Sequence, residues 1–237
     1  MIAERKRQPF FGWVVVWAAF VTAIFGWGVG FYGPPVFLKA VQDAHGWSVS
    51  LVSAAVTLHF LVGAVVVANL PRLHRRFGLP AVTTTGAAVL VVGVLGWSLA
   101  QEPWQLFLAT LLSGGGWVTL GAAAINAMVS PWFVRRRPAA LSTAYNGASI
   151  GGVVFSPLWV ALIGWGGFPL AAAMVGVVMV TAVGLLASRV LNRSPAELGL
   201  CPDGVGEAAA AQPAQLRSPR KVAALWADAA FLTICSA

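Results

Sequence analysis

The chain has 237 residues, of which 59% are hydrophobic and only 9% are charged. A soluble domain carries about 25% charged residues, so this composition excludes an ordinary water-soluble fold. The formal net charge of +8 could indicate nucleic-acid binding, but the basic residues border long apolar stretches and form no basic domain of their own. We therefore expect an integral membrane protein that binds no nucleic acid.

Six apolar segments are long enough to cross a bilayer as helices, which takes about 20 residues each. The expected spans are 10–32, 48–70, 80–100, 104–128, 139–163 and 169–188. Gly33, Pro34 and Pro35 should end the first span, because proline cannot continue a helix. Ser48 is a suitable N-cap for the second span. The expected fold class is thus an all-α membrane bundle of six helices, occupying residues 10–189.

The basic residues predict the orientation of this bundle. All the lysines and arginines except Lys39 lie in alternate gaps between the spans. Because cytoplasmic loops are enriched in these residues, the pattern places the amino-terminal tail 1–9 and the loops 71–79 and 129–138 in the cytoplasm. The loops 33–47, 101–103 and 164–168 should then be external. The amino-acid composition is rich in alanine, glycine and arginine and poor in lysine, as in bacteria with GC-rich genomes. This favours the cytoplasmic cell membrane as the location.

The chain changes character after the sixth span. Residues 190–222 contain four prolines and a run of alanines, which predicts a polar cytoplasmic linker. From residue 223 the sequence turns apolar again, and it stops about half-way through what would be a seventh span. We therefore expect 223–237 to be the truncated start of that span within a longer architecture.

The spans also differ in polarity. Spans 80–100 and 169–188 hold few polar residues and should face lipid, whereas the second, fourth and fifth spans should face a cavity or other helices. Two triplets of helices, each with its third helix outermost, are typical of transporters built from a 3+3 inverted repeat. Both triplets also turn before their last helix through similar sequence, at residues 77–80 and 167–170.

Four segments resemble one transporter family. The run from Trp132 to Gly147 resembles the signature that leads into the fifth span in the monocarboxylate and oxalate/formate branch of the major facilitator superfamily (MFS). The other three segments are 12–15, 46–48 and the run 195–204, which resembles the sequence after the sixth span in that branch. The resemblance implies the amino-terminal half of a secondary transporter. Such a protein would move a small organic solute, here a carboxylate, by alternating access.

One loop departs from the family pattern. The superfamily usually has Gly, three residues, Asp, Arg, one residue and Gly between spans two and three. This chain keeps Arg76 and Gly78 but has Pro71 in place of the glycine and Arg75 in place of the aspartate. The lysine that some monocarboxylate carriers place late in span one aligns near Phe31 or Tyr32, so proton-coupled lactate-type transport is not supported.

Two groups of residues are candidates for function. The substrate-cavity candidates are Trp27, Phe31, Tyr32, His59, Trp117, Asn146 and Ser149, and the candidates for a cytoplasmic gate or topology signal are Arg75, Arg76, Arg135, Arg136 and Arg137. An ionisable residue inside a membrane span is a functional hypothesis, and the pKa of a histidine can cross the physiological range. Each candidate has a structural alternative: a neutral His59 bonded between helices, aromatic packing, or an amide that joins two helices.

Two further functions remain open. Residues 147–151 match the Gly-x-Ser-x-Gly pattern of a hydrolase nucleophile elbow, although that elbow needs a strand–turn–helix. An intramembrane serine protease would require Ser149 close to His59, and a third alternative is a membrane regulator or fragment without transport. We expect no enzyme activity, cofactor or metal. The expected partners are the lipid bilayer, a small organic anion, and a missing carboxyl-terminal six-helix half or a dimer partner.

Overall fold

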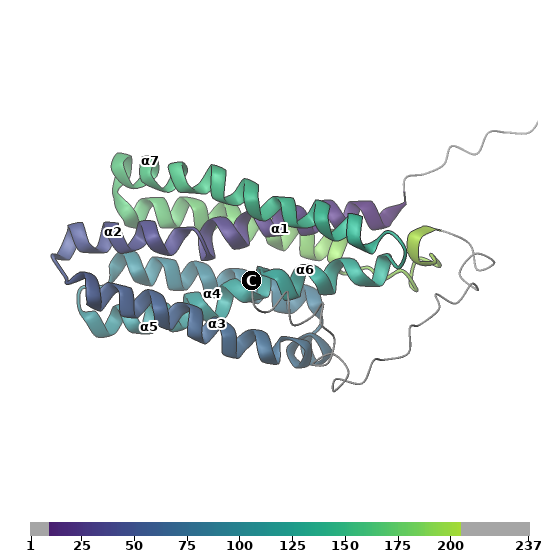
Figure 1. Ribbon diagram of the computed structural model, residues 1–237, viewed down its shortest axis with the longest axis horizontal. Helices are drawn as coiled ribbons and strands as arrows, with labels where there is room; N and C mark the ends of the chain where they lie inside the picture. The colour runs from purple at the N-terminus through teal and green to yellow at the C-terminus, as the bar shows by residue number, and fades with distance from the viewer. Residues whose placement is uncertain (1–9, 205–237) are drawn as a thin grey trace, which may run out of the picture. The chain divides into compact units, whose positions relative to one another are not determined.

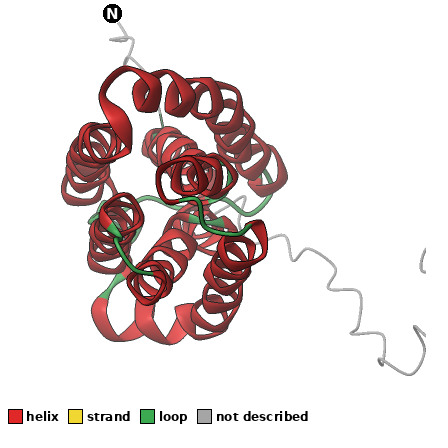
Figure 2. Ribbon diagram, turned by 90° about the vertical axis from the view of Figure 1, so that its left-hand side faces the viewer, coloured by secondary structure: helices red, strands yellow, loops and turns green. Residues whose placement is uncertain are grey.

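The computed structural model describes residues 10–204, and all regular secondary structure in that range is helical (Figures 1 and 2). Five of its helical segments are long and apolar enough to span a membrane. The expected all-α membrane fold class is therefore confirmed. The expected amino-terminal tail 1–9, the expected linker over residues 205–222 and the expected start of a seventh span at 223–237 lie outside the described residues. The elements run α1 (Phe11–Gly30), α2 (Gly33–His45), α3 (Val49–Phe77), α4 (Leu79–Leu99), α5 (Pro103–Trp117), η1 (Val118–Leu120), α6 (Ala122–Val129), η2 (Ser130–Trp132), α7 (Arg137–Leu186), η3 (Ala187–Leu191) and η4 (Pro202–Gly204).

The segment named α7 contains two antiparallel helices and completes six passes. Gly167 has φ 80° and ψ 165°, a conformation that breaks the helix and that glycine adopts without steric cost. Phe168 stacks on Phe37 with ring centroids 5.0 Å apart, whereas Arg193 lies 5.5 Å from the ring of Phe11 at the start of α1. The chain therefore reverses at Gly167 and returns along the bundle, as Figure 1 shows.

An internal repeat is visible in the backbone. Gly78, between α3 and α4, has φ 80° and ψ 151°, almost the geometry of Gly167, and each glycine is followed by an apolar residue and a proline. The helix breaks repeat as well: α1 gives way to α2 at Tyr32, and α5 gives way to α6 at Gly121. The same number of residues separates Tyr32 from Gly121 and Gly78 from Gly167, as the expected 3+3 repeat requires.

The proline pair after the first span starts a helix and does not end one. Pro34 and Pro35 occupy the first turn of α2, where the missing N–H groups would have no helical partner and the fixed φ suits the helix. The expected external loop 33–47 was therefore wrong over residues 33–45. The first span is a pair of helical pieces that together run from Phe11 to His45.

The expected loop 71–79 was also wrong. α3 continues through Pro71 to Phe77, so that only Gly78 lies between it and α4. The proline removes one backbone bond, but the turns around it still pack on the bundle, since Leu70 is buried and Leu73 is half-buried. The external turn expected at 164–168 likewise shortens to the single residue Gly167.

The described arginines gather at one of the two ends of the bundle. Val15, Leu79, Trp132 and Arg193 line one shallow pocket at one end, and His45, Ser98 and Phe168 line another at the opposite end. We call the first the arginine end, because all described arginines belong to the chain segments that meet there: Arg72, Arg75, Arg76, Arg135, Arg136, Arg137, Arg189 and Arg193. That this end is cytoplasmic stays a prediction.

Glycines allow the helices of the two triplets to approach closely. A Cβ atom on Gly151 of α7 would lie 2.6 Å from the carbonyl oxygen of Ile24 in α1, and one on Gly147 would collide with the carbonyl of Phe20. Gly147 and Gly151 therefore form a helix-packing step between α1 and α7. Such contacts hold membrane helices together where lipid removes the usual hydrophobic driving force.

A carboxylate ties the segment after the sixth span to the amino end of α7. Asp203 accepts backbone N–H bonds from Val134 at 3.1 Å, Arg135 at 2.7 Å and Arg136 at 3.1 Å. Partial burial acts to raise the pKa of Asp203, but these three N–H groups and the positive charge of Arg136 outweigh it. The pKa of this carboxyl therefore lies below the usual range of an aspartate.

Replacing Gly151 by Val should force α1 and α7 apart and lower the free energy of unfolding by about 1–3 kcal/mol or more, the usual cost of overpacking. Gly184→Val is the matched control, because a Cβ on Gly184 meets nothing within 4 Å. Thermal unfolding in detergent micelles measures both variants. Equal midpoints for the two would contradict the close contact between α1 and α7.

Replacing Asp203 by Ala should cost about 1 kcal/mol at pH 7, because three backbone N–H groups lose their acceptor. A lowered folded-state pKa means that this stability is present above the unfolded pKa of about 3.9 and is lost as the pH falls further. Unfolding midpoints should thus separate wild type from variant at pH 7 and 5 and converge below about pH 4. A difference that grows on acidification would refute this account, and Asp43→Ala, which loses only the exposed contact to Lys39, is the control.

Candidate functional site

The break in the first span leaves backbone carbonyls that need partners. The carbonyl of Trp27 accepts from the backbone N–H groups of Phe31 at 3.0 Å and Tyr32 at 2.8 Å. Two side chains from other helices satisfy the next ones: the indole N–H of Trp159 donates to Gly28 at 3.2 Å, and Nε2 of His59 donates to Gly30 at 2.9 Å. In hydrocarbon an unpaired carbonyl costs several kcal/mol, so these bonds make the break possible.

His59 lies at the centre of a buried polar network. A carbonyl can only accept, so Nε2 carries the proton toward Gly30, and Nδ1 of the neutral ring accepts from the hydroxyl of Ser113 at 2.8 Å. The indole N–H of Trp97 donates to the same hydroxyl at 3.1 Å. This network joins α1, α3, α4 and α5, and His59 is only 1% exposed. Both ring nitrogens are used between helices, which agrees with the structural alternative for this residue.

An aromatic cluster gathers where the broken first and fourth spans meet α3. We define it as Trp27, Phe31, Tyr32, Phe60 and Trp117. The ring of Trp117 at the end of α5 lies 6.5 Å from Trp27, 6.0 Å from Phe31 and 5.9 Å from Phe60. The other cluster rings are half-buried, while Phe31 is 42% exposed, so the cluster presents an apolar, accessible face. Four cavity candidates named from the sequence are thus brought together, with Phe60 added.

A polar pair borders this cluster. Nδ2 of Asn126 in α6 donates to the phenol oxygen of Tyr145 in α7 at 2.6 Å. The phenol of Tyr145 donates in turn to the carbonyl of Ala122 at 3.0 Å. The ring of Tyr145 makes an edge contact with Trp27 at 6.4 Å. Sequence reasoning named neither residue as a site candidate. The sequence signal that could have identified this pair is the position of Asn126 shortly after Gly121.

Asn146 and Ser149 occupy a neighbouring stripe of α7. Both are exposed and lie about one helical turn apart. Tyr32 connects this stripe to the aromatic cluster, because a Cβ on Gly152 would lie only 2.7 Å from its ring. Asn146 and Ser149 therefore lie beside the aromatic cluster on an accessible face. Among the described residues, neither side chain forms a hydrogen bond with a ring of the cluster.

The geometry gives no support to a serine protease. The ring nitrogens of His59 are bonded to Ser113 and Gly30, whereas Ser149 is exposed on α7. The Gly-x-Ser-x-Gly run lies inside a helix and not on a strand–turn–helix, so its glycines serve packing. Across residues 10–204 no group of three or more His, Cys, Asp or Glu residues could hold a metal ion.

The candidate gate arginines form two groups at the arginine end. Arg75 and Arg76 are exposed on the last turn of α3, and the guanidinium of Arg76 lies 5.1 Å from the ring of Phe77. Arg135, Arg136 and Arg137 precede and start α7, where Arg137 donates to the carbonyls of Phe133 at 2.9 Å and Ser130 at 3.3 Å. The side chain of Arg76 is thus packed on its own helix, and that of Arg137 is bonded to the segment before α7.

Comparison with known proteins identifies the family of this chain. The model of the Major Facilitator Superfamily matches residues 17–237. The chain is 30% identical over 205 residues to MFS transporter asaE of Aspergillus flavus, covering 81% of this chain and 44% of that protein. It is 28% identical over 206 residues to monocarboxylate transporter 13 of Bos taurus, covering 82% of this chain and 46% of that protein.

MFS-type transporter 1 of an Ophiocordyceps species is a third relative, 30% identical over 168 residues that make up 68% of this chain and 36% of that protein. The chain thus spans less than half the length of these curated relatives. The helical bundle, its internal repeat and the match over residues 17–237 agree: the chain belongs to the major facilitator superfamily of membrane transporters.

Proposed function

We propose that this chain forms the amino-terminal six-helix bundle of a secondary active transporter that moves a small organic carboxylate by alternating access. The observation that carries the proposal is the meeting of the two broken spans at the aromatic cluster. In transporters built from inverted repeats, substrate sites lie near the membrane midplane beside helices that are interrupted there. The expected positions of the spans and of the basic residues support an orientation with the amino terminus in the cytoplasm of the cell membrane.

The face made by the cluster and the α7 stripe suits a small amphipathic solute. Phe31 and Trp27 supply apolar ring surface, and Asn146 and Ser149 supply an amide and a hydroxyl at its border. The described membrane-spanning stretches contain no lysine or arginine near this face that could neutralise a carboxylate. We therefore infer that the counter-charge comes from a second six-helix bundle, which would close the other side of the cavity. A second copy of the chain is the alternative source.

Uptake into proteoliposomes tests this function. Radiolabelled short-chain monocarboxylates and their neutral amides are offered to vesicles that hold the chain alone or together with a carboxyl-terminal six-helix bundle. We expect uptake of the carboxylates, not the amides, and only when both bundles are present. Vigorous uptake by the chain alone would overturn the two-bundle proposal. No uptake in either case would favour a regulator without transport. Ser149→Ala should remain active, with a KM raised at most about fivefold by the loss of one bordering hydroxyl, an outcome that a Ser149-dependent protease mechanism would not give.

Phe31→Ala should raise the KM for the transported solute about two- to tenfold, because one aromatic contact contributes about 0.5–1.5 kcal/mol beyond its buried area. Leu111→Ala in α5 is the matched control, since Leu111 and Phe31 are both 42% exposed and Leu111 is outside the cluster. Concentration dependence of uptake measures both. A similar KM for the two variants would remove the cluster from the substrate site.

His59→Asn should lower the free energy of unfolding by about 2–3 kcal/mol, since the shorter amide cannot reach both Gly30 and Ser113. If the role of His59 is structural, the uptake that remains should keep the pH profile of the wild type. Uptake between pH 5 and 8 measures this. A profile that becomes flat in His59→Asn would instead assign the residue to proton coupling.

A further inference from the structure

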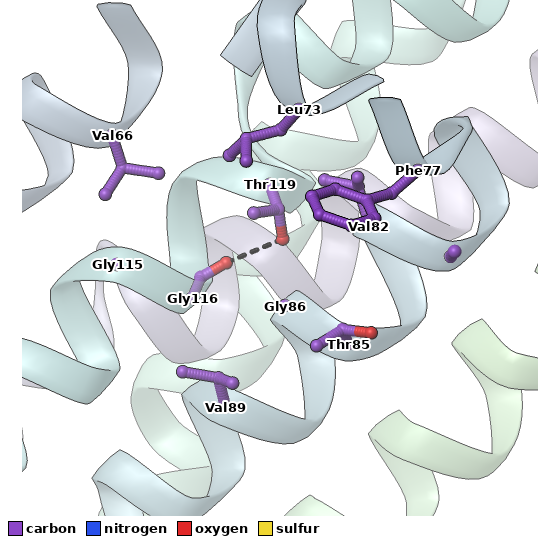
Figure 3. A pocket seen from close by; sticks show the side chains of 11 residues that line it. Val66, Leu73, Phe77, Val82, Thr85, Gly86, Val89, Gly115, Gly116 and Thr119 are labelled. Atoms are coloured by element: carbon purple, nitrogen blue, oxygen red, sulfur yellow. Dashed lines mark hydrogen bonds between the residues drawn. The ribbon is translucent and has the colours of Figure 1, made fainter. Parts of the chain in front are cut away.

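A lateral groove lies between α3, α4 and α5 and extends from Gly115 and Gly116 to Phe77 at the arginine end. Its volume is about 430 Å³, within the roughly 300–1,000 Å³ of typical ligand sites. Figure 3 shows the side chains that face it, from Val66, Leu73 and Phe77 on α3 to Val82 and Val89 on α4 and Thr119 beyond α5. The hydroxyl of Thr119 donates to the carbonyl of Gly116 at 2.8 Å, so it is already satisfied. The lining therefore offers hydrocarbon and hardly any hydrogen-bonding group.

The groove exists because α3 fits closely against α5 near its middle and more loosely toward its carboxyl end, although Leu70 there still packs on the bundle. Near the middle of the helix, a Cβ on Gly114 of α5 would collide with the backbone carbonyl of His59. On the groove side, a Cβ on Gly115 would meet only Val66 and Val62, at 3.8 and 3.9 Å. Farther along, Phe77 is 56% exposed although it belongs to a helix that elsewhere packs on α5. An apolar space is thus left open beside an exposed ring.

One arginine stands at the mouth of this groove, and two more lie on other sides of the same helix. Arg76 lies over the ring of Phe77, which lines the groove, with its guanidinium 5.1 Å from the ring centroid. Arg72 donates to Oδ1 of Asn69 at 3.1 Å, and Arg75 is exposed on the same last turns of α3. Within residues 10–204 the only ion pair is Lys39–Asp43, at the opposite end, so the arginines meet no acidic side chain there. Arg75 also stands where the family pattern has an aspartate, which adds positive charge.

We propose that an anionic phospholipid binds here, with one acyl chain in the groove and its phosphate against Arg76. An apolar groove with a guanidinium at its edge is complementary to an acyl chain that carries an anionic headgroup. Basic residues next to a membrane span attract anionic headgroups, and each adds about a fivefold gain in affinity near the surface. A soluble carboxylate would find only the hydroxyls of Thr85 and Thr119, and no positive charge, inside the groove. The proposal is independent of whether the chain transports a solute.

Native mass spectrometry of the purified chain tests the site. The probes are dioleoylphosphatidylglycerol and dioleoylphosphatidylcholine, which share acyl chains and differ in headgroup charge. We expect phosphatidylglycerol to bind at least tenfold more tightly. Arg75→Gln/Arg76→Gln should weaken it about fivefold, through the loss of Arg76, whereas Arg135→Gln/Arg136→Gln, which removes two arginines from the other group at this end, should stay within about twofold.

A second pair of variants tests the groove itself. Ala81 lines it and is exposed, so Ala81→Trp should fill the groove and weaken both lipids at least tenfold without disturbing the buried core. Ala161→Trp, at an exposed position outside the groove, should bind like wild type. Equal binding of the two lipids, equal losses in the two arginine pairs, or unchanged binding in Ala81→Trp would each overturn the proposal. Competition by inorganic phosphate would assign the arginines to a free anion and overturn it too.

Discussion

A helix that breaks inside a membrane must find new partners for the carbonyls it exposes, and this constraint shapes the whole bundle. The break after Gly30 is compatible with hydrocarbon because the indole of Trp159 and the imidazole of His59 reach the carbonyls of Gly28 and Gly30. These two side chains come from α7 and α3, so the same bonds that complete the first span also hold its neighbours in place. Ser113 and Trp97 extend this chain of bonds to α5 and α4.

Glycine residues set how closely neighbouring helices approach one another. At Gly151 and Gly114 the neighbouring backbones come so close that no side chain fits between them. Large rings then fill the places where the helices separate, as Phe37, Trp97 and Trp159 do in the core. The accessible aromatic cluster lies where closely packed helices give way to helices that are farther apart. Its rings are held by tightly packed helices on one side and left uncovered on the other.

The sequence predicted the fold class, the six passes and the repeat, because each depends on long apolar runs and on the spacing of charges and turns. It misplaced the connections. The patterns at Pro71 and at Gly33–Pro35 were interpreted as ends of helices, but proline is tolerated in a first turn and in a helix that tertiary contacts continue to support. The cluster of Trp27, Phe31 and Trp117 was predicted in part, since aromatic residues beside glycines are visible in a linear chain.

The partners of those residues could not be predicted in the same way. That His59 would bond Ser113 and not Ser149, or that Asn126 would meet Tyr145, depends on which helix faces which. Asp203 is the extreme case, because its bonds to residues 134–136 join two segments that no local pattern relates. Hydrophobic periodicity places residues on a helix, while helix packing decides their neighbours.

The single-residue connections at Gly78 and Gly167 have a mechanical consequence. Each leaves only two rotatable backbone angles between long helices, and the link 100–102 is also short, with Gln105 accepting from the backbone N–H groups of residues 101 and 102. None of these joints has slack for one helix to slide lengthwise past the next. The described bundle should therefore move as one stiff body. Any large displacement must be taken up where the bundle meets something else.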